Sequence, residues 1–242
     1  YSGHIAALKG DLQGLNQGNV HIAVDYQLLP QHFAATYENS MALSKILSFP
    51  GVNIDARDAS GKSILHFAAA TGATDCLAYL IKEKKLDIVK TVDMRKKTAL
   101  RLAAGFDQYL CVAQLANALK EANVKLDKVV DEAGFNALHM AAIHSSIVSL
   151  AYLIANGLSP SSQSDSGLTA LHLAASNGDV ACIEALLSRQ APIDAREATA
   201  EMTPLLYAIM SGSHLAVNSL LHHGARIDLY SRGGETPLHI AA

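Results

Sequence analysis

Histidine and cysteine are the residues of this 242-residue chain that could most readily carry chemistry. Histidine can ligate metals or act as a general base, and cysteine can act as a nucleophile or form a disulfide. Six of the eleven histidines occupy the same place in a repeated tetrapeptide: His4, His32, His66, His139, His172 and His239. If repeats stack, equivalent histidines lie ~10 Å apart, too far to share a metal ion at ~2 Å. We therefore predict structural histidines and no metal site.

The remaining chemical candidates are equally weak. Each cysteine lies ten residues after a tetrapeptide, at Cys76, Cys111 and Cys182, so neighbouring cysteines should also be ~10 Å apart, beyond the ~7 Å reach of a disulfide. We expect buried, reduced thiols. Gly61-Lys62-Ser63 resembles the end of a phosphate-binding loop, but Ala56 stands where the first Gly belongs. His214, His222 and His223 have no ligand-like spacing and are predicted to be surface residues. We predict no catalytic residue and no cofactor.

The tetrapeptide recurs along the whole chain with a period of about 33 residues. Its first residue, Thr, Ser or Asn, suits the N-cap of a helix, and Pro204 and Pro237 suit the first helical position. A later apolar cluster predicts a second helix, ended by a glycine such as Gly157 or Gly224. The tetrapeptides are Ser63–His66, Thr98–Arg101, Asn136–His139, Thr169–His172, Thr203–Leu206 and Thr236–His239.

This pattern resembles the ankyrin repeat, whose Thr-Pro-Leu-His-x-Ala-Ala signature is matched throughout residues 1–242. The resemblance implies an all-α solenoid of stacked helix-turn-helix units with projecting β-hairpin loops, each repeat stabilised chiefly by its neighbours. It also implies that the tetrapeptide histidine hydrogen-bonds within and between repeats. We expect residues 1–242 to form a single ankyrin-repeat array of about seven repeats plus the start of an eighth. Because Ala242 falls halfway through a first helix, we expect a fragment of a longer chain.

Several positions depart from the ankyrin pattern. Glu38, Asp107 and Ser145 stand where glycine is expected, and Arg101 and Leu206 replace the histidine. The interval from 101 to 139 carries roughly one extra helical turn, so we expect a longer loop at residues 123–131. The first interval is short, and residues 16–30 match the pattern least.

The composition argues against several classes of partner and of cellular location. Half of the residues are apolar and 17% are charged, which is typical of a folded, soluble, helical protein. A net charge of -3 argues against nucleic acid, and no apolar stretch approaches the ~18 residues of a membrane span. Three cysteines and the absence of an Asn-x-Ser/Thr acceptor favour a cytoplasmic protein over a secreted one.

The ankyrin resemblance implies that a protein partner, or another domain of the same polypeptide, binds a concave face formed by hairpin tips and the exposed ends of first helices. The repeat register places twelve candidate residues there: Arg95, Lys97, Phe106, Glu132, Phe135, Ile143, His144, Asp165, Leu168, Asn177, Met202 and Met210. The apolar members are candidates for hot spots of binding.

We therefore expect a non-catalytic scaffold or adaptor that binds proteins. One alternative is the ankyrin arm of a larger membrane-active protein, similar to TRP-type channels or to latrotoxin-like pore-forming toxins, and the toxin would be secreted. A third reading is the substrate-selecting region of an enzyme whose catalytic domain lies outside these residues. Sequence beyond Ala242 would discriminate among the three.

Overall fold

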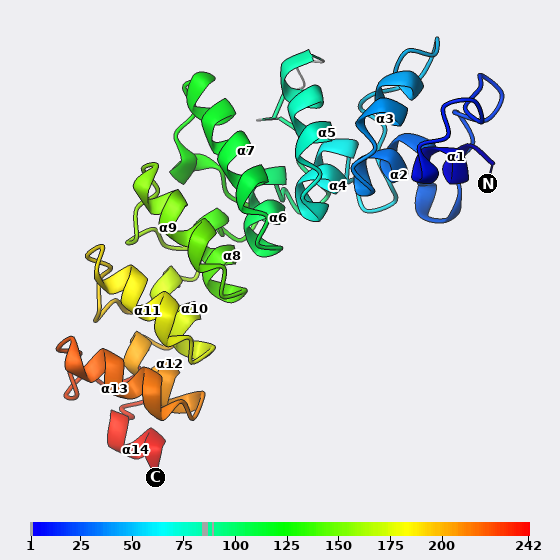
Figure 1. Ribbon diagram of the computed structural model, residues 1–242. Helices are drawn as coiled ribbons and strands as arrows, with labels where there is room; N and C mark the ends of the chain where they lie inside the picture. The colour runs from blue at the N-terminus through cyan, green and yellow to red at the C-terminus, as the bar shows by residue number, and fades with distance from the viewer. Residues whose placement is uncertain (1, 84–86, 89) are drawn as a thin grey trace. The chain divides into compact units, whose positions relative to one another are not determined.

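The computed structural model describes residues 2–83, 87–88 and 90–242 of the chain. Within these residues every extended regular element is a helix, as Figure 1 shows, and the predicted all-α class is confirmed. Contacts group the chain into two compact units, residues 1–124 and 125–242, which we call unit 1 and unit 2 and describe separately. The single array predicted for 1–242 stays a prediction.

Unit 1 has two layers of helices (Figure 1). In the layer of first helices, each helix packs on the next: α1 (Ser2–Lys9), α2 (Pro30–Thr36), α4 (Ile64–Thr71) and α6 (Ala99–Gly105). The layer of second helices contains α3 (Ser40–Ile46), α5 (Thr74–Ala78) with the π-helical turn η2 (Tyr79–Glu83), and α7 (Tyr109–Glu121). A 3-10 turn, η1 (Asp25–Gln27), precedes α2.

Unit 2 repeats the same two-layer plan. Its first helices are α8 (Ala137–Ile143), α10 (Ala170–Ser176), α12 (Pro204–Met210) and α14 (Pro237–Ala241). Its second helices are α9 (Ile147–Ala155), α11 (Val180–Leu187) and α13 (His214–His222). A 3-10 turn, η3 (Leu126–Lys128), begins the unit.

The first helices begin at the predicted N-caps. The Thr98 and Thr169 hydroxyls accept the backbone N–H groups of Arg101 and His172, which would otherwise have no helical partner. Pro204 and Pro237 lie in the first turns of α12 and α14, where a missing N–H costs nothing. Local sequence therefore determines where these helices start.

The core lies between neighbouring first helices and between the two layers. The paired alanines of the repeat are fully buried, as are inward-facing side chains such as Leu65 of a tetrapeptide and Leu150 of a second helix. Since alanine adds only a methyl group, adjacent first helices can approach closely. The fully buried alanines are Ala34, Ala35, Ala68, Ala69, Ala103, Ala104, Ala141, Ala142, Ala174 and Ala175.

Two expectations about repeat lengths need correction. The first repeat has no second helix, because residues 11–24 form turns, and this explains the short first interval and leaves fewer than seven complete helix pairs. The extra residues of the fourth repeat do not lengthen the loop at 123–131. They lie in α7, which has 13 residues against 7 to 9 in α3, α9, α11 and α13. Helical propagation satisfies one backbone hydrogen bond per added residue, whereas a longer loop satisfies none.

The projecting hairpins are present, but their strand pairing is minimal. In the described residues it is limited to isolated bridges, Val24 with Leu28, Arg57 with Ser63 and Val92 with Thr98. The substitutes for glycine adopt the backbone that glycine favours: φ is 54° at Glu38, 54° at Asp107 and 58° at Ser145. The expectation of a left-handed position after each first helix is therefore confirmed.

Candidate protein-interaction surface

The tetrapeptide histidines hold the framework that carries the candidate surface. His66 Nδ1 accepts the N–H of Ser63 at 3.1 Å, so its Nε2 carries the proton and donates to the carbonyl of Lys97 at 3.0 Å. In unit 2, His172 Nδ1 accepts the N–H of Thr169 at 3.1 Å and its Nε2 donates to Met202 O at 3.1 Å. Each ring therefore joins the start of one helix to the next hairpin, as the ankyrin resemblance implied.

Histidine contacts also place the first repeat in register. His4 Nε2 donates to Leu28 O at 3.1 Å, and Leu28 directly precedes the next N-cap, as Lys97 does in the contact of His66. His32 Nδ1 accepts the N–H of Leu29 at 2.9 Å, as His66 accepts that of Ser63, while its Nε2 donates to Ala56 O at 3.2 Å. His4 and His32 therefore each match His66 despite the short interval between them. Burial lowers the pKa of His32, His66 and His172, which keeps these rings neutral.

The cysteines are buried thiols, as predicted. Cys76, Cys111 and Cys182 are fully buried and unpaired in disulfides. Burial raises the pKa of Cys76 to about 12 and that of Cys111 to about 11, so almost no thiolate forms near neutral pH. The Cys76 and Cys111 thiols each face a carbonyl of the preceding repeat's first helix, Ala34 O and Ala68 O. These side chains are packing residues.

Hydrogen bonds between successive hairpin tips fix the positions of the tips within each unit. In unit 1, Ala59 N–H donates to Tyr26 O at 2.8 Å and Met94 N–H donates to Ser60 O at 3.3 Å. In unit 2, equivalent bonds run from Asp165 to Ala133, from Ala198 to Ser166 and from Arg232 to Ala200. The tips therefore form an ordered row of backbone in each unit, from which side chains project.

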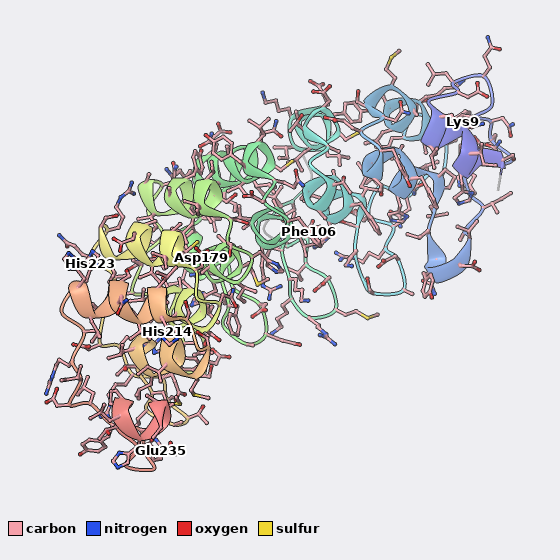
Figure 2. All side chains as sticks on the ribbon, turned by 60° about the horizontal axis from the view of Figure 1, so that its bottom comes forward. Lys9, Phe106, Asp179, His214, His223 and Glu235 are labelled. Carbon is pink, nitrogen blue, oxygen red and sulfur yellow. The ribbon has the colours of Figure 1, made fainter. Side chains whose placement is uncertain are left out.

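In unit 1 the structure exposes two of the three predicted residues. Arg95 lies exposed at a hairpin tip, and Phe106, at the end of α6 (Figure 2), is 59% exposed. Lys97 is half-buried, and its carbonyl accepts the bond from His66. Arg95 and Lys97 belong to one hairpin, whereas Phe106 lies at the opposite end of its helix.

In unit 2 the predicted residues divide into three groups. Five are exposed: Glu132, His144, Asp165, Asn177 and Met210. Three are half-buried, namely Phe135, Ile143 and Leu168, and the Phe135 ring packs edge-on against His139 with centroids 5.3 Å apart. The last, Met202, is only 9% exposed.

Met202 is therefore a wrong prediction as an exposed contact residue. Met202 keeps the register of Lys97 and Leu168, because its carbonyl likewise accepts the bond from the tetrapeptide histidine. This position is half-buried in those two hairpins, and the Met202 side chain is buried more deeply. Asn177 is exposed as predicted, but its amide already caps the carbonyl end of α8.

Counting in repeats four to seven alone missed the aromatic residues of the second and third repeats. Tyr26 and Tyr37 are exposed, and a cavity of about 150 Å³ lies between α2 and α4, lined by Leu28, His32, Phe33, Thr36, Tyr37 and Phe67. Tyr37 occupies the register position of Phe106, five residues after the tetrapeptide, so the same rule could have found it. Tyr26 lies in the short first interval, where no register was available.

The cluster around His223 was also missed. His223, at the end of α13 (Figure 2), has its Nε2 3.2 Å from a Glu184 carboxylate oxygen, and Ser219 Oγ donates to the same carboxylate at 2.6 Å. His223 was predicted to be a surface residue, and it is exposed, but its contact with Glu184 was not predicted. His223 joins α13 to α11. Ser219 and Glu184 are 35 residues apart, which is about one repeat, and this spacing could have indicated that they meet.

Over residues 2–83, 87–88 and 90–242, no group of three or more His, Cys, Asp or Glu side chains is arranged to hold a metal ion. In that part of the chain, no helix has the length and apolar character needed to span a bilayer.

Comparison with known sequences gives the family. Models of ankyrin repeats match residues 31–128 and 114–197, and a further ankyrin-repeat model matches residues 189–242. The chain belongs to the ankyrin-repeat family, whose repeats generally act as protein–protein interaction modules and bind protein partners.

Individual relatives agree with this assignment. The human ASB11 ankyrin repeat domain is similar in structure, with a TM-score of 0.77, 20% identity and coverage of 93% of this chain and 99% of that one. The mouse (Mus musculus) B-cell lymphoma 3 protein homolog is 34% identical over 47% of this chain and 26% of its own length. The ZDHHC13 protein of Danio rerio, named as a palmitoyltransferase, is 25% identical over 86% of this chain and 31% of its own length. The chain therefore spans less than a third of the length of the mouse protein and of the Danio rerio protein.

Proposed function

We propose that this chain is a non-catalytic scaffold or adaptor module that binds protein partners through its hairpin tips and the ends of its first helices. The observation that supports this function is that large apolar side chains are exposed on hairpins and helices that hydrogen bonds hold in place. Phe106 is 59% exposed, Met94 72% and Met210 63%. Burying one such side chain in a partner would contribute about 1.5–3 kcal/mol.

The state of the nucleophiles and bases supports a non-catalytic role. Both ring nitrogens of His66 and of His172 are occupied by backbone groups, so neither ring can take up a substrate proton without losing a framework bond. The raised pKa values of Cys76 and Cys111 remove the thiolate that nucleophilic attack requires. The cytoplasm is the compartment we propose, because none of these buried thiols forms a disulfide.

One comparison favours a second candidate function. Since a relative named as a palmitoyltransferase shares these repeats, the chain could equally serve as the substrate-selecting part of an enzyme whose catalytic domain lies elsewhere in the polypeptide. In that case the full polypeptide would modify the same proteins that this chain binds. Acyl transfer by the full polypeptide to a captured partner, measured with a labelled acyl-CoA, would support this second function.

The test of the binding function is selection of peptides from a displayed random library on the purified chain, followed by calorimetric titration. We expect saturable binders that Phe106→Ala weakens by about tenfold, the effect of removing one hot-spot residue. Leu110→Ala is the matched control, because Leu110 is 61% exposed but lies on α7 in the other helical layer. Absence of any saturable binder, or equal effects of the two substitutions, would contradict the proposed surface.

Phe106 is a better probe than Phe135. Phe106→Ala should change the free energy of unfolding by less than about 0.5 kcal/mol, because the side chain is exposed. Phe135→Ala removes a half-buried ring that packs on His139, so a loss of binding there could arise from a disturbed framework.

A further inference from the structure

Two consecutive hairpins of unit 1, residues 57–62 and 92–97, concentrate positive charge. They contain five basic and two acidic residues, namely Arg57, Lys62, Arg95, Lys96 and Lys97 with Asp58 and Asp93. The carboxylates belong to the turns themselves. Asp58 Oδ1 accepts the N–H of Lys62 at 2.7 Å, and Asp93 Oδ1 accepts the N–H of Lys97 at 2.8 Å. The acidic groups thus hold the backbone while the basic groups project.

Four of these basic side chains have no acidic partner in the part of the chain that the structure describes. The ion pairs found there do not include Lys62, Arg95, Lys96 or Lys97. Arg95 and Lys96 are exposed, and Lys62 and Lys97 are half-buried. The fifth, Arg57, donates to the carbonyls of Gly61 and Val92 and so links the two hairpins. These four cationic groups therefore have no direct ion pair of their own to break before they pair with a partner.

A groove with an apolar rim lies among these charges. It has a volume of about 360 Å³ and is lined by Gln27, Arg57, Asp58, Gly61, Val92, Asp93 and Met94. The Met94 side chain lies over Gly61, where an added Cβ would come within 2.9 Å of the Met94 Cγ, and it remains 72% exposed. The groove therefore offers an apolar contact next to a group of cations.

Lys96 occupies a backbone position that four other hairpins give to glycine and one gives to Glu201, whose φ is also 55°. The φ of Lys96 is 55°, and the equivalent residues Gly61, Gly134, Gly167 and Gly234 have φ between 77° and 81°. The turn is the same as at Gly61, since the N–H of Lys96, like that of Gly61, donates to the carbonyl three residues earlier. A lysine here is strained relative to glycine, so replacing it with glycine separates the strain of the turn from the charge of the side chain.

We propose that Lys62, Met94, Arg95, Lys96 and Lys97, which we name the basic hairpin surface, bind an acidic peptide segment of the partner protein. An apolar side chain of that segment enters the groove beside Met94, and its carboxylates pair with the four cations. This inference rests on the proposed function and adds the chemistry of the partner to it.

A protein segment fits better than a polyanion such as nucleic acid. Unit 2 has six basic and eleven acidic residues, and the whole chain has a net charge of -3, which repels a long polyanion. The methionine and valine of the groove supply an apolar contact that a phosphate backbone would not use.

The experiment compares synthetic fluorescent peptides in which aspartate and glutamate flank a central Leu-Phe pair with matched peptides carrying lysine at each acidic position. Binding to the purified chain is followed by anisotropy at several salt concentrations. We expect the acidic peptides to bind and the lysine peptides not to bind. The double substitution Arg95→Glu and Lys96→Glu should weaken binding by more than about tenfold, and added salt should weaken it further.

The matched control is Arg189→Glu with Lys128→Glu, which changes the net charge equally at exposed positions outside this surface. We expect it to leave affinity within about twofold, because screened distant charges contribute little. Met94→Ala should also weaken binding, whereas Met41→Ala, at an equally exposed methionine on α3, should not.

Lys96→Gly gives a readout that a purely structural role would not produce. It should raise the Tm, because the left-handed strain is removed, and at the same time weaken binding of the acidic peptide. A higher Tm with unchanged affinity would overturn the inference.

Two further outcomes would overturn it. One is that the charge-reversed double variant binds acidic peptides as well as the parent does. The other is that an oligothymidine strand or phosphatidylserine vesicles bind with the same dependence on Arg95 and Lys96, which would make the surface a general polyanion site. If library selection yields binders that are not acidic and do not need Arg95, the proposed function stands and only this inference fails.

Discussion

The hairpins of unit 1 and unit 2 are built alike but charged differently. Asp93 Oδ1 accepts two N–H groups of its turn in unit 1, and Asp131 Oδ1 does the same in unit 2, at 3.0 Å from Ala133 N and 2.9 Å from Phe135 N. Yet unit 1 has thirteen basic and eleven acidic residues, against six and eleven in unit 2. Because the turn needs only one capping side chain and one left-handed residue, the other tip positions can carry either charge. Framework and recognition are thus separate in these repeats.

The shared histidine bond is the strongest test of this comparison. His66→Leu in unit 1 and His172→Leu in unit 2 should each lower the free energy of unfolding by about 1–3 kcal/mol, because each leaves the buried backbone N–H of Ser63 or Thr169 without its partner and removes a bond to the next hairpin. Urea unfolding followed by circular dichroism measures the loss. Leu206→His tests the opposite change. In unit 2, the repeat with helices α12 and α13 has Leu206 at the histidine position, and this substitution adds the missing ring. A loss in only one unit would show that the two frameworks differ.

Substitution of the left-handed glycines of the hairpins should cause the next largest loss of stability. Gly61 and Gly167 have φ of 80° and 78°, and a Cβ at either would lie 2.8 Å from a backbone nitrogen of the next hairpin. Alanine at each position should cost about 1–3 kcal/mol, with strain and contact acting together. Gly212→Ala, with φ of 70° but no atom within 4 Å of the added Cβ, should cost less. Equal thermal shifts for all three variants would argue against the role of the hairpin contact.

Mild acid should destabilise both units gradually, and this should be the smallest of the three stability effects. Burial lowers the pKa of His32, His66 and His172, whereas in the unfolded chain these groups titrate near 6.5. As the pH falls below 6.5, the unfolded state binds more protons than the folded state, so the free energy of unfolding decreases until the folded pKa values are passed. Urea titrations between neutral pH and pH 5 measure the slope. His172→Gln should reduce it, and a stability that rises on acidification would contradict the protonation states assigned here.

The fold was largely predictable because its signals are local and repeated. Thr98 and Thr169 cap helices through their own hydroxyls, and the paired alanines mark the close helix contacts wherever they occur. What the pattern could not show was where irregular residues go. The extra turn of the fourth repeat entered α7 and not the loop, because a helix can absorb additional residues while satisfying their backbone groups.

The candidate surface was predicted less well than the fold. Counting from the tetrapeptide found Arg95, Phe106 and Met210, which are exposed, because their hairpins and helices keep the standard length. It failed at Met202, whose position is half-buried at Lys97 and Leu168 and buried here. It also did not reveal that the Asn177 amide serves the framework, since that contact joins residues 34 positions apart.

Residue order alone therefore established the helical class, the repeat period and the capping residues, because each follows from interactions within a few residues or from the periodicity. Only the folded arrangement decided which tip residues face outward, that Glu184 would meet Ser219 and His223, and that Lys96 would adopt a glycine-like backbone among unpaired cations. These features arise from contacts between repeats, where small changes in loop length and neighbouring side chains redirect a residue without altering the local pattern.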